Sequence, residues 1–169
     1  MAAMQFLVEQ GVDSITIVNL TERLHVTKGS FYHHFKDVAD FKAQMLALCI
    51  EESLSSIAQQ TRTGATPYEQ LRLLESMAAV HDPMEVALRA WALRDEQARQ
   101  ALTDLDAKRM AYIESLFREN GLQDTGVAEA GRLFYALFIG GQHVLPPLNP
   151  DQMQAAFGII RQHFGVGVT

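Results

Sequence analysis

The stretch from Thr16 to Lys36, TIVNLTERLHVTKGSFYHHFK, constrains the fold more than any other part of the chain. It contains two candidate helix N-caps, Thr16 and Thr27, eleven residues apart. Between them, apolar residues recur at i, i+3 and i+7, the spacing of one helix face: Ile17, Leu20 and Leu24. The pattern predicts two short helices joined by a tight turn at His25-Val26.

The second of these helices has an apolar side and a polar side. Phe31 and Phe35, four residues apart, are expected to face inward. Asp37 is expected to cap a third helix, with Asp40 at the capping-box position. Two helices joined by so short a turn form a helix-turn-helix, whose second helix enters the DNA major groove in known complexes. An ordinary helical hairpin on a protein surface remains an alternative.

The polar side of the second helix has residue types that suit DNA. Thr27 and Ser30 have hydroxyl groups, Tyr32 has a phenol, and Lys28 supplies positive charge for phosphates. Gly29 lacks a side chain where the helix would approach the duplex. Lys36 adds a second cation at the end of the segment.

The sequence VTKGSFYHHFK, preceded by a Thr-opened helix and the segment Glu9-Gln10-Gly11, resembles the TetR family of bacterial transcription regulators. The resemblance extends over about Phe6 to Met45. It implies a three-helix DNA-binding domain whose third helix reads the groove, and a larger helical domain that binds a ligand and dimerises. The positions that it implies contact the DNA backbone are Thr16, Thr27, Ser30, Tyr32, His33 or His34, and Lys36.

The chain departs from the family pattern at four places. His25 stands where the turn usually has Gly, and His tolerates the left-handed conformation better than most residues. Val18 replaces a common basic residue, and Val38 replaces a second Lys. The chain begins Met1-Ala2-Ala3-Met4, where family members usually have a basic arm and a longer first helix.

The helix start and stop signals in the rest of the sequence predict an all-α protein. A DNA-binding domain is expected over residues 1–46 and a ligand-binding and dimerisation domain over 47–169. Thr66-Pro67-Tyr68-Glu69, Asp82-Pro83-Met84-Glu85 and Asn149-Pro150 read as helix starts. Helices are expected over about 2–10, 16–24, 27–35, 37–60, 67–80, 83–94, 95–120, 125–144 and 150–164, and Gly11 and Gly121 are expected to end helices.

Charge and cysteine content restrict the expected DNA affinity and the cellular compartment. The net charge is −6, and residues 1–46 hold four basic against five acidic side chains. We therefore expect weaker or more salt-sensitive DNA binding than a basic homologue would show. The lone cysteine, Cys49, cannot form an internal disulfide and is expected to be buried. No signal peptide or membrane span is evident, which indicates a cytoplasmic protein with no membrane partner.

Two further sites are expected in the second domain. The apolar stripes of the last two helices predict a homodimer interface: Phe134, Leu137, Phe138, Phe157 and Ile160. Gly140-Gly141 would allow close helix approach there. An apolar small-molecule pocket is expected between helices, with three residues that are large or adaptable, Met77, Trp91 and Tyr112, and with Phe117.

Catalysis and metal binding find little support. His33 and His34 are adjacent and point to different sides of a helix, and no histidine has a Cys or carboxylate partner at ligand spacing. Phosphate-loop and nucleophile motifs are absent from the sequence. We therefore expect no cofactor, no metal and no enzymatic activity.

Two functions are compatible with these patterns. The first is a ligand-responsive, dimeric DNA-binding regulator, most simply a repressor that a small molecule releases from a palindromic operator. The second is a TetR-fold ligand-binding or protein-interaction module with weak or lost DNA binding. Val18, the weakly basic head and the short first helix motivate the second.

Overall fold

The computed structural model describes residues 2–167, and over this range the chain is helical and has no strand. This confirms the predicted all-α class. The elements in order are α1 (Ala2–Gln10), the 3₁₀ turn η1 (Val12–Ser14), α2 (Ile17–Leu24), α3 (Lys28–His34), α4 (Val38–Thr61), α5 (Pro67–Ala78), α6 (Pro83–Ala92), α7 (Glu96–Glu119), α8 (Asp124–His143) and α9 (Pro150–His163).

The chain divides into two compact units. Unit 1 comprises the residues up to 52 together with 83–104, and unit 2 comprises 53–82 and the residues from 105 onward. The helices α4 and α7 each contribute residues to both units. A domain boundary near residue 46 remains a prediction. The compact units do not follow a single cut of the chain, because α6 and the start of α7 belong with the N-terminal helices.

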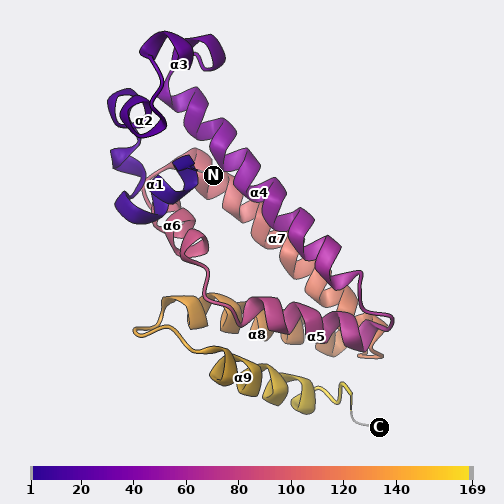
Figure 1. Cartoon of the computed structure of the whole chain (residues 1–169). Helices are drawn as coiled ribbons and strands as arrows, with labels where there is room; N and C mark the ends of the chain where they lie inside the picture. Colours follow the sequence, from indigo (N-terminus) through magenta and orange to yellow (C-terminus); the bar gives the residue numbers. More distant parts are fainter. Residues whose placement is uncertain (1, 168–169) are drawn as a thin grey trace. The chain divides into compact units, whose positions relative to one another are not determined.

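Unit 1 is built around the three N-terminal helices. The helix α1 packs against α2 and α6, and α2 packs against α3 (Figure 1). Gly11 ends α1 with φ 77°, as predicted, and η1 then leads into α2. The core of unit 1 consists of buried apolar residues from α1 to α3, from the first half of α4, from α6 and from the start of α7, together with Ile15: Phe6, Leu7, Ile15, Leu20, Phe31, Phe41, Met45, Leu46, Cys49, Leu88, Trp91, Ala98 and Leu102.

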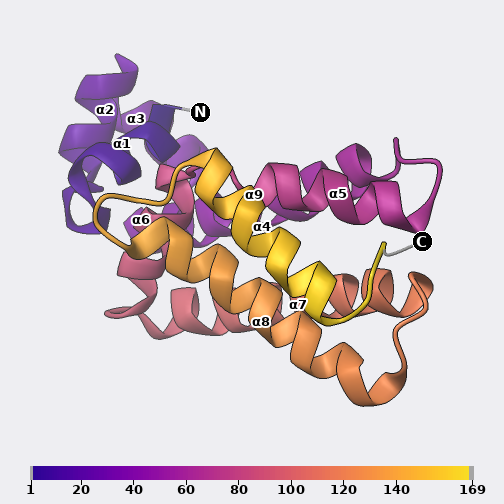
Figure 2. The same ribbon diagram turned by 90° about the horizontal axis from the view of Figure 1, so that it is seen from below.

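Unit 2 is a helical bundle in which α8 and α9 lie antiparallel and side by side (Figures 1 and 2). Phe134 of α8 stacks on Phe157 of α9 with ring centroids 4.4 Å apart. A Cβ on Gly141 would lie 2.3 Å from Met153 Sδ, so Gly141 allows close approach of α8 and α9 within one chain. Gly140 faces open space.

Most helix ends form where the sequence predicts them. Thr66 and Glu69 make a reciprocal capping box at the start of α5, and Asn149 and Gln152 make another at the start of α9. Gly121 has φ 89° just after α7. Glu85, predicted to belong to a capping box at α6, is buried and its Oε1 accepts a hydrogen bond from Arg89 Nε at 2.7 Å.

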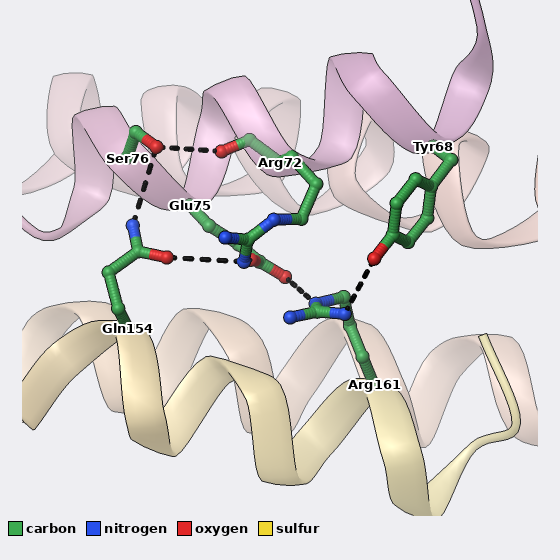
Figure 3. Close-up of polar contacts among 6 residues, drawn as sticks. All are labelled: Tyr68, Arg72, Glu75, Ser76, Gln154 and Arg161. Atoms are coloured by element: carbon green, nitrogen blue, oxygen red, sulfur yellow. Dashed lines mark hydrogen bonds and ion pairs between the residues drawn. The ribbon is translucent and has the colours of Figure 1, made fainter. Parts of the chain in front are cut away.

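A buried ionic cluster joins α5 to α9 (Figure 3). Glu75 is fully buried; its carboxylate accepts a hydrogen bond from Arg161 Nε at 2.7 Å and forms an ion pair with Arg72. Arg161 Nη1 also donates to the hydroxyl of Tyr68 at 3.1 Å. Burial raises the pKa of Glu75, and attraction to Arg161 and Arg72 opposes that rise. The cluster therefore depends on both arginines.

Arg161→Met should destabilise the protein by about 3 kcal/mol or more, because it leaves the buried Glu75 carboxylate with the more exposed Arg72 alone. Urea unfolding followed by circular dichroism measures the change. Arg72→Met is the matched control, since the Arg72 side chain is 39% exposed against 14% for Arg161, and its loss should cost clearly less. Equal effects of the two substitutions would contradict the conclusion that Arg161 is the main partner of the buried Glu75 carboxylate.

Candidate nucleic-acid interface

Two threonines start the helices of the motif, as predicted. Thr16 Oγ1 accepts a hydrogen bond from Asn19 N at 3.2 Å, and Thr27 Oγ1 accepts one from Ser30 N at 3.1 Å. Both threonines are exposed. Each hydroxyl oxygen therefore fixes a helix start as an acceptor, and the hydroxyl can still donate its own proton to a phosphate oxygen.

The turn between α2 and α3 depends on one unusual backbone conformation. His25 has φ 51° and ψ 40°, the left-handed region. Its backbone N–H and that of Val26 donate to the last carbonyls of α2, on Glu22 at 3.3 Å and Thr21 at 3.0 Å. The left-handed conformation that the sequence suggests for His25 is thus confirmed, and a residue with a Cβ bears a conformational cost there.

The helix α3 is held by a single buried side chain. Phe31 is 5% exposed and packs against Phe35 and Phe41, with ring centroids 5.2 Å and 5.8 Å away. Tyr32 is 55% exposed and contacts the edge of Phe31. The other residues of α3 are exposed, and they are the residues that the sequence assigns to DNA or their neighbours: Lys28, Gly29, Ser30, His33 and His34.

One of the few cations of the motif is committed to an internal contact. Arg23 donates from Nη1 and Nη2 to the two carboxylate oxygens of Glu9, at 2.8 Å and 3.1 Å, and lies over the ring of Phe6. Sequence analysis missed this pair, since nothing in the local pattern links residues fourteen apart. The permanent positive charges that remain at α3 are Lys28 and Lys36, both exposed.

The link from α3 to α4 is fixed by two carboxylates. Asp40 N donates to Asp37 Oδ1 at 2.8 Å, and Lys36 N donates to Asp40 Oδ2 at 2.9 Å. The hydrogen bond from the Lys36 backbone is the main cause that lowers the pKa of Asp40. Because its backbone is held in this way, Lys36 has a defined position beside α3.

The residues predicted to line a ligand pocket fall in different units. Met77, Tyr112 and Phe117 belong to unit 2, and Trp91 belongs to unit 1. Phe117 is fully buried, and the Tyr112 hydroxyl donates to Thr61 Oγ1 at 2.6 Å. Trp91 is 4% exposed and its side chain is hydrogen-bonded to Asp95. A pocket at these residues remains a prediction.

The residues predicted for the dimer interface divide into two groups. Phe134 and Phe157 are 2% and 0% exposed and form the core of unit 2 in a single chain. A charge at Phe134 would therefore disrupt the fold itself. The other three, Leu137, Phe138 and Ile160, are partly buried against that core. The large apolar side chains that α8 and α9 expose are Leu133, at 51%, and Ile159, at 67%.

Residues 2–167 contain neither a metal-ligand cluster nor a membrane-spanning helix. No three side chains from His, Cys, Asp and Glu gather in an arrangement that could hold a metal ion. No helix within the same residues is long and apolar enough to cross a membrane.

An exposed polar second helix, entered through a tight turn, defines unit 1 as a helix-turn-helix head. The profile of bacterial regulatory proteins of the tetR family matches residues 1–41. The Transposon Tn10 TetC protein of Escherichia coli is 40% identical over 50 residues, a match that spans 30% of this chain and 23% of that protein. The N-terminal head is thus similar to the TetR family over residues 1–41, which is the resemblance that the sequence predicts.

Solved structures extend the likeness in fold to the whole chain. A transcriptional regulator from Rhodococcus sp. Rha1 superposes with a TM-score of 0.79 at 15% identity, covering 99% of this chain and 95% of that one. A TetR-family regulator from Streptomyces coelicolor gives 0.79 at 16% identity, covering 95% and 85%. A transcriptional regulator from Saccharomonospora viridis, solved in complex with choline, gives 0.81 at 16%, covering 96% and 92%.

His25→Gly should stabilise the protein by about 1 kcal/mol, because Gly adopts the left-handed conformation without the steric cost of a Cβ. The midpoint of urea unfolding should rise. His25→Val is the matched control: a β-branched residue is strained at positive φ, so the midpoint should fall. A lower midpoint for His25→Gly would mean that the imidazole itself stabilises the turn.

Proposed function

We propose that this chain is a dimeric DNA-binding transcription regulator, and more narrowly a repressor that a small molecule releases from a palindromic operator. The observation that carries the proposal is the exposed polar face of α3, held in place by Phe31, within a segment that matches the TetR family. Sequence-specific helix-turn-helix proteins present their second helix to the major groove in this way.

The exposed face of α3 and its neighbours have groups suited to contacts with phosphates and with base edges. Lys28 and Lys36 supply positive charge to phosphates, and the hydroxyls of Thr16 and Thr27 lie at helix starts, where backbone N–H groups also favour anions. Tyr32 presents a phenol that is more than half exposed. Because Gly29 has no side chain and Ser30 has a small one, the N-terminal part of the helix can approach base edges closely.

The chemistry of α8 and α9 supports the proposed dimer. Along α8, Leu133, Ala136, Leu137 and Gly140 recur at helical spacing on the outer side, and Ile159 lies exposed on α9. Small residues beside exposed Leu and Ile allow two helix pairs to approach closely and to bury apolar surface. A two-fold dimer would match two half-sites of a palindromic operator.

An effector site is proposed in unit 2. Support comes from the Saccharomonospora viridis relative, which was solved with choline, and from a half-buried polar cluster in this chain. Arg109 donates to Ser53 Oγ at 2.6 Å and lies over the ring of Phe138, and Tyr135 donates to Asp106 Oδ1 at 2.6 Å. Burial raises the pKa of Tyr135, so its hydroxyl remains protonated even further above neutral pH than that of an ordinary tyrosine.

Such a cluster within an apolar bundle could orient a ligand through a few polar groups. A ligand that prefers one spacing of the two DNA-reading heads would lower DNA affinity, and by linkage DNA would lower the affinity for that ligand by the same factor.

DNA binding is tested by selection from a random-sequence duplex library, followed by titration of the recovered duplex. Lys28→Ala and Lys36→Ala should each weaken binding and reduce the salt slope by about one phosphate contact per subunit. Tyr32→Ala should also weaken binding without unfolding the protein. Lys108→Ala, an exposed lysine of α7 in unit 2, is the matched control and should leave affinity unchanged.

Recovery of no duplex at low salt would reject the regulator and favour a TetR-fold module without DNA binding. Recovery of a duplex whose affinity and salt slope are the same for all three variants would remove these residues from the interface.

The dimer is tested by Leu133→Glu combined with Ile159→Glu. Two carboxylates on the exposed faces of α8 and α9 should produce monomers at micromolar concentration, because burying them in an interface is costly. Sizing with light scattering measures the mass, and circular dichroism should show unchanged helix content.

Leu93→Glu is the matched control for the dimer. Leu93 is 81% exposed but lies in unit 1, outside α8 and α9, so its substitution should leave the mass unchanged. A double variant that remains dimeric, or a wild-type chain that is monomeric, would refute this interface.

A further inference from the structure

His33 occupies the middle of the exposed face of α3. Each helical residue advances by about 100°, so a position two residues after the buried Phe31 lies on nearly the opposite side of the helix. Gly29 is one turn earlier on the same side. A Cβ there would contact only Thr27 Oγ1, at 3.6 Å. The His33 imidazole therefore stands beside bare helix backbone, where a duplex can approach.

A second imidazole lies next to the first. The rings of His33 and His34 have centroids 5.0 Å apart in an edge-on arrangement, and both residues are exposed. Both lie in the last turn of α3, where the helix carbonyls favour positive charge. Among residues 2–167, no ion pair that the structure resolves joins either ring to a carboxylate, so neither ring has an internal counter-ion.

The charged residues of the motif around these rings come from three elements. On α3 there is Lys28; on α2 there are Glu22 and the Glu9-paired Arg23; and at the start of α4 there are Lys36, Asp37 and Asp40. Glu9 neutralises Arg23, so Lys28 and Lys36 are the permanent cations left against Glu22, Asp37 and Asp40. Two positive charges at His33 and His34 would therefore double the number of unpaired cations at α3.

We propose that DNA binding by this chain is coupled to proton uptake at His33 and His34, so that mild acidification strengthens binding. This inference rests on the proposed function. Residues 1–46 contain four permanent cations, and one of them, Arg23, is paired with Glu9. Each added imidazolium is therefore a large fraction of the charge that can meet phosphates.

The physical basis is the linkage between protonation and binding. An imidazole changes its charge between about pH 5 and 8, and a nearby phosphate stabilises the charged form. If the DNA complex holds more protons than the free protein, affinity must rise as pH falls. One additional phosphate contact per subunit should also steepen the salt slope, by about 0.9 for each contact.

The experiment runs the duplex selection at pH 6 and at pH 8 in parallel and then titrates the full chain with the recovered duplex at both values. Wild-type affinity should be about tenfold or more higher at pH 6, with a steeper salt slope. The double variant with His33→Gln and His34→Gln should lose most of this pH dependence while still binding at pH 8. Its helix content is checked by circular dichroism.

His163→Gln is the matched control, because His163 is an exposed histidine of α9 in unit 2. This variant should keep the full pH dependence. His33→Lys supplies a permanent charge and should bind at pH 8 more tightly than wild type.

Four outcomes distinguish failure of the proton coupling from failure of the proposed DNA-binding function. Binding that is equal at pH 6 and pH 8 would overturn the proton coupling and leave the regulator intact. A pH dependence that survives in the double glutamine variant would overturn the assignment to α3. If the double glutamine variant loses its helical content, the affinity of His33→Lys at pH 8 becomes the test. An affinity no higher than that of wild type would then overturn the proton coupling. Absence of any recovered duplex at either pH would overturn both proposals.

Discussion

The packing of Phe31 against Phe35 and Phe41 is the contact on which the candidate interface depends. The helix α3 has seven residues and buries one of them, so this aromatic cluster decides which side of the helix faces outward. The same cluster connects α3 to the start of α4, where Asp37 and Asp40 fix the chain. The packing of Phe31 therefore fixes both the core contact of α3 and the set of polar side chains that the helix exposes.

The charges of unit 1 indicate how a weakly charged head could present the proposed DNA-binding face. The contact between Arg23 and Glu9 stabilises the packing of α1 and α2 but takes one cation away from α3. Hydroxyls, a phenol, two lysines and imidazoles are what remain. A face of this composition relies on hydrogen bonds and on conditional charge, and its affinity should respond to the medium more than that of an arginine-rich face.

Local patterns in the sequence were sufficient for the motif and most helix ends. Thr16, Thr27 and Gly121 occupy the cap or turn positions that their chemistry predicts, because caps and turns depend on neighbours in sequence. The sequence also predicted the left-handed turn at His25 and the all-α class. The compact units were not predictable, since they depend on how α6 packs against α1.

Contacts between distant residues explain the remaining differences. Hydrophobic spacing alone could not tell whether Phe134 and Phe157 face a second chain or each other, and in the structure they stack within one chain. The buried Glu75 pairs with Arg161, eighty-six residues away, and no local signal marks either residue as a partner. Amphipathic stripes identify a buried face but not what covers it.

The shortness of α3 also has a consequence for its dynamics. A helix with one buried side chain has few contacts that resist local opening, so its backbone amides should exchange with solvent faster than those of the bundle in unit 2. A bound duplex would have to suppress these openings. Part of any binding free energy would then be spent on ordering the reading helix, and amide protection at α3 would report occupancy of the site directly.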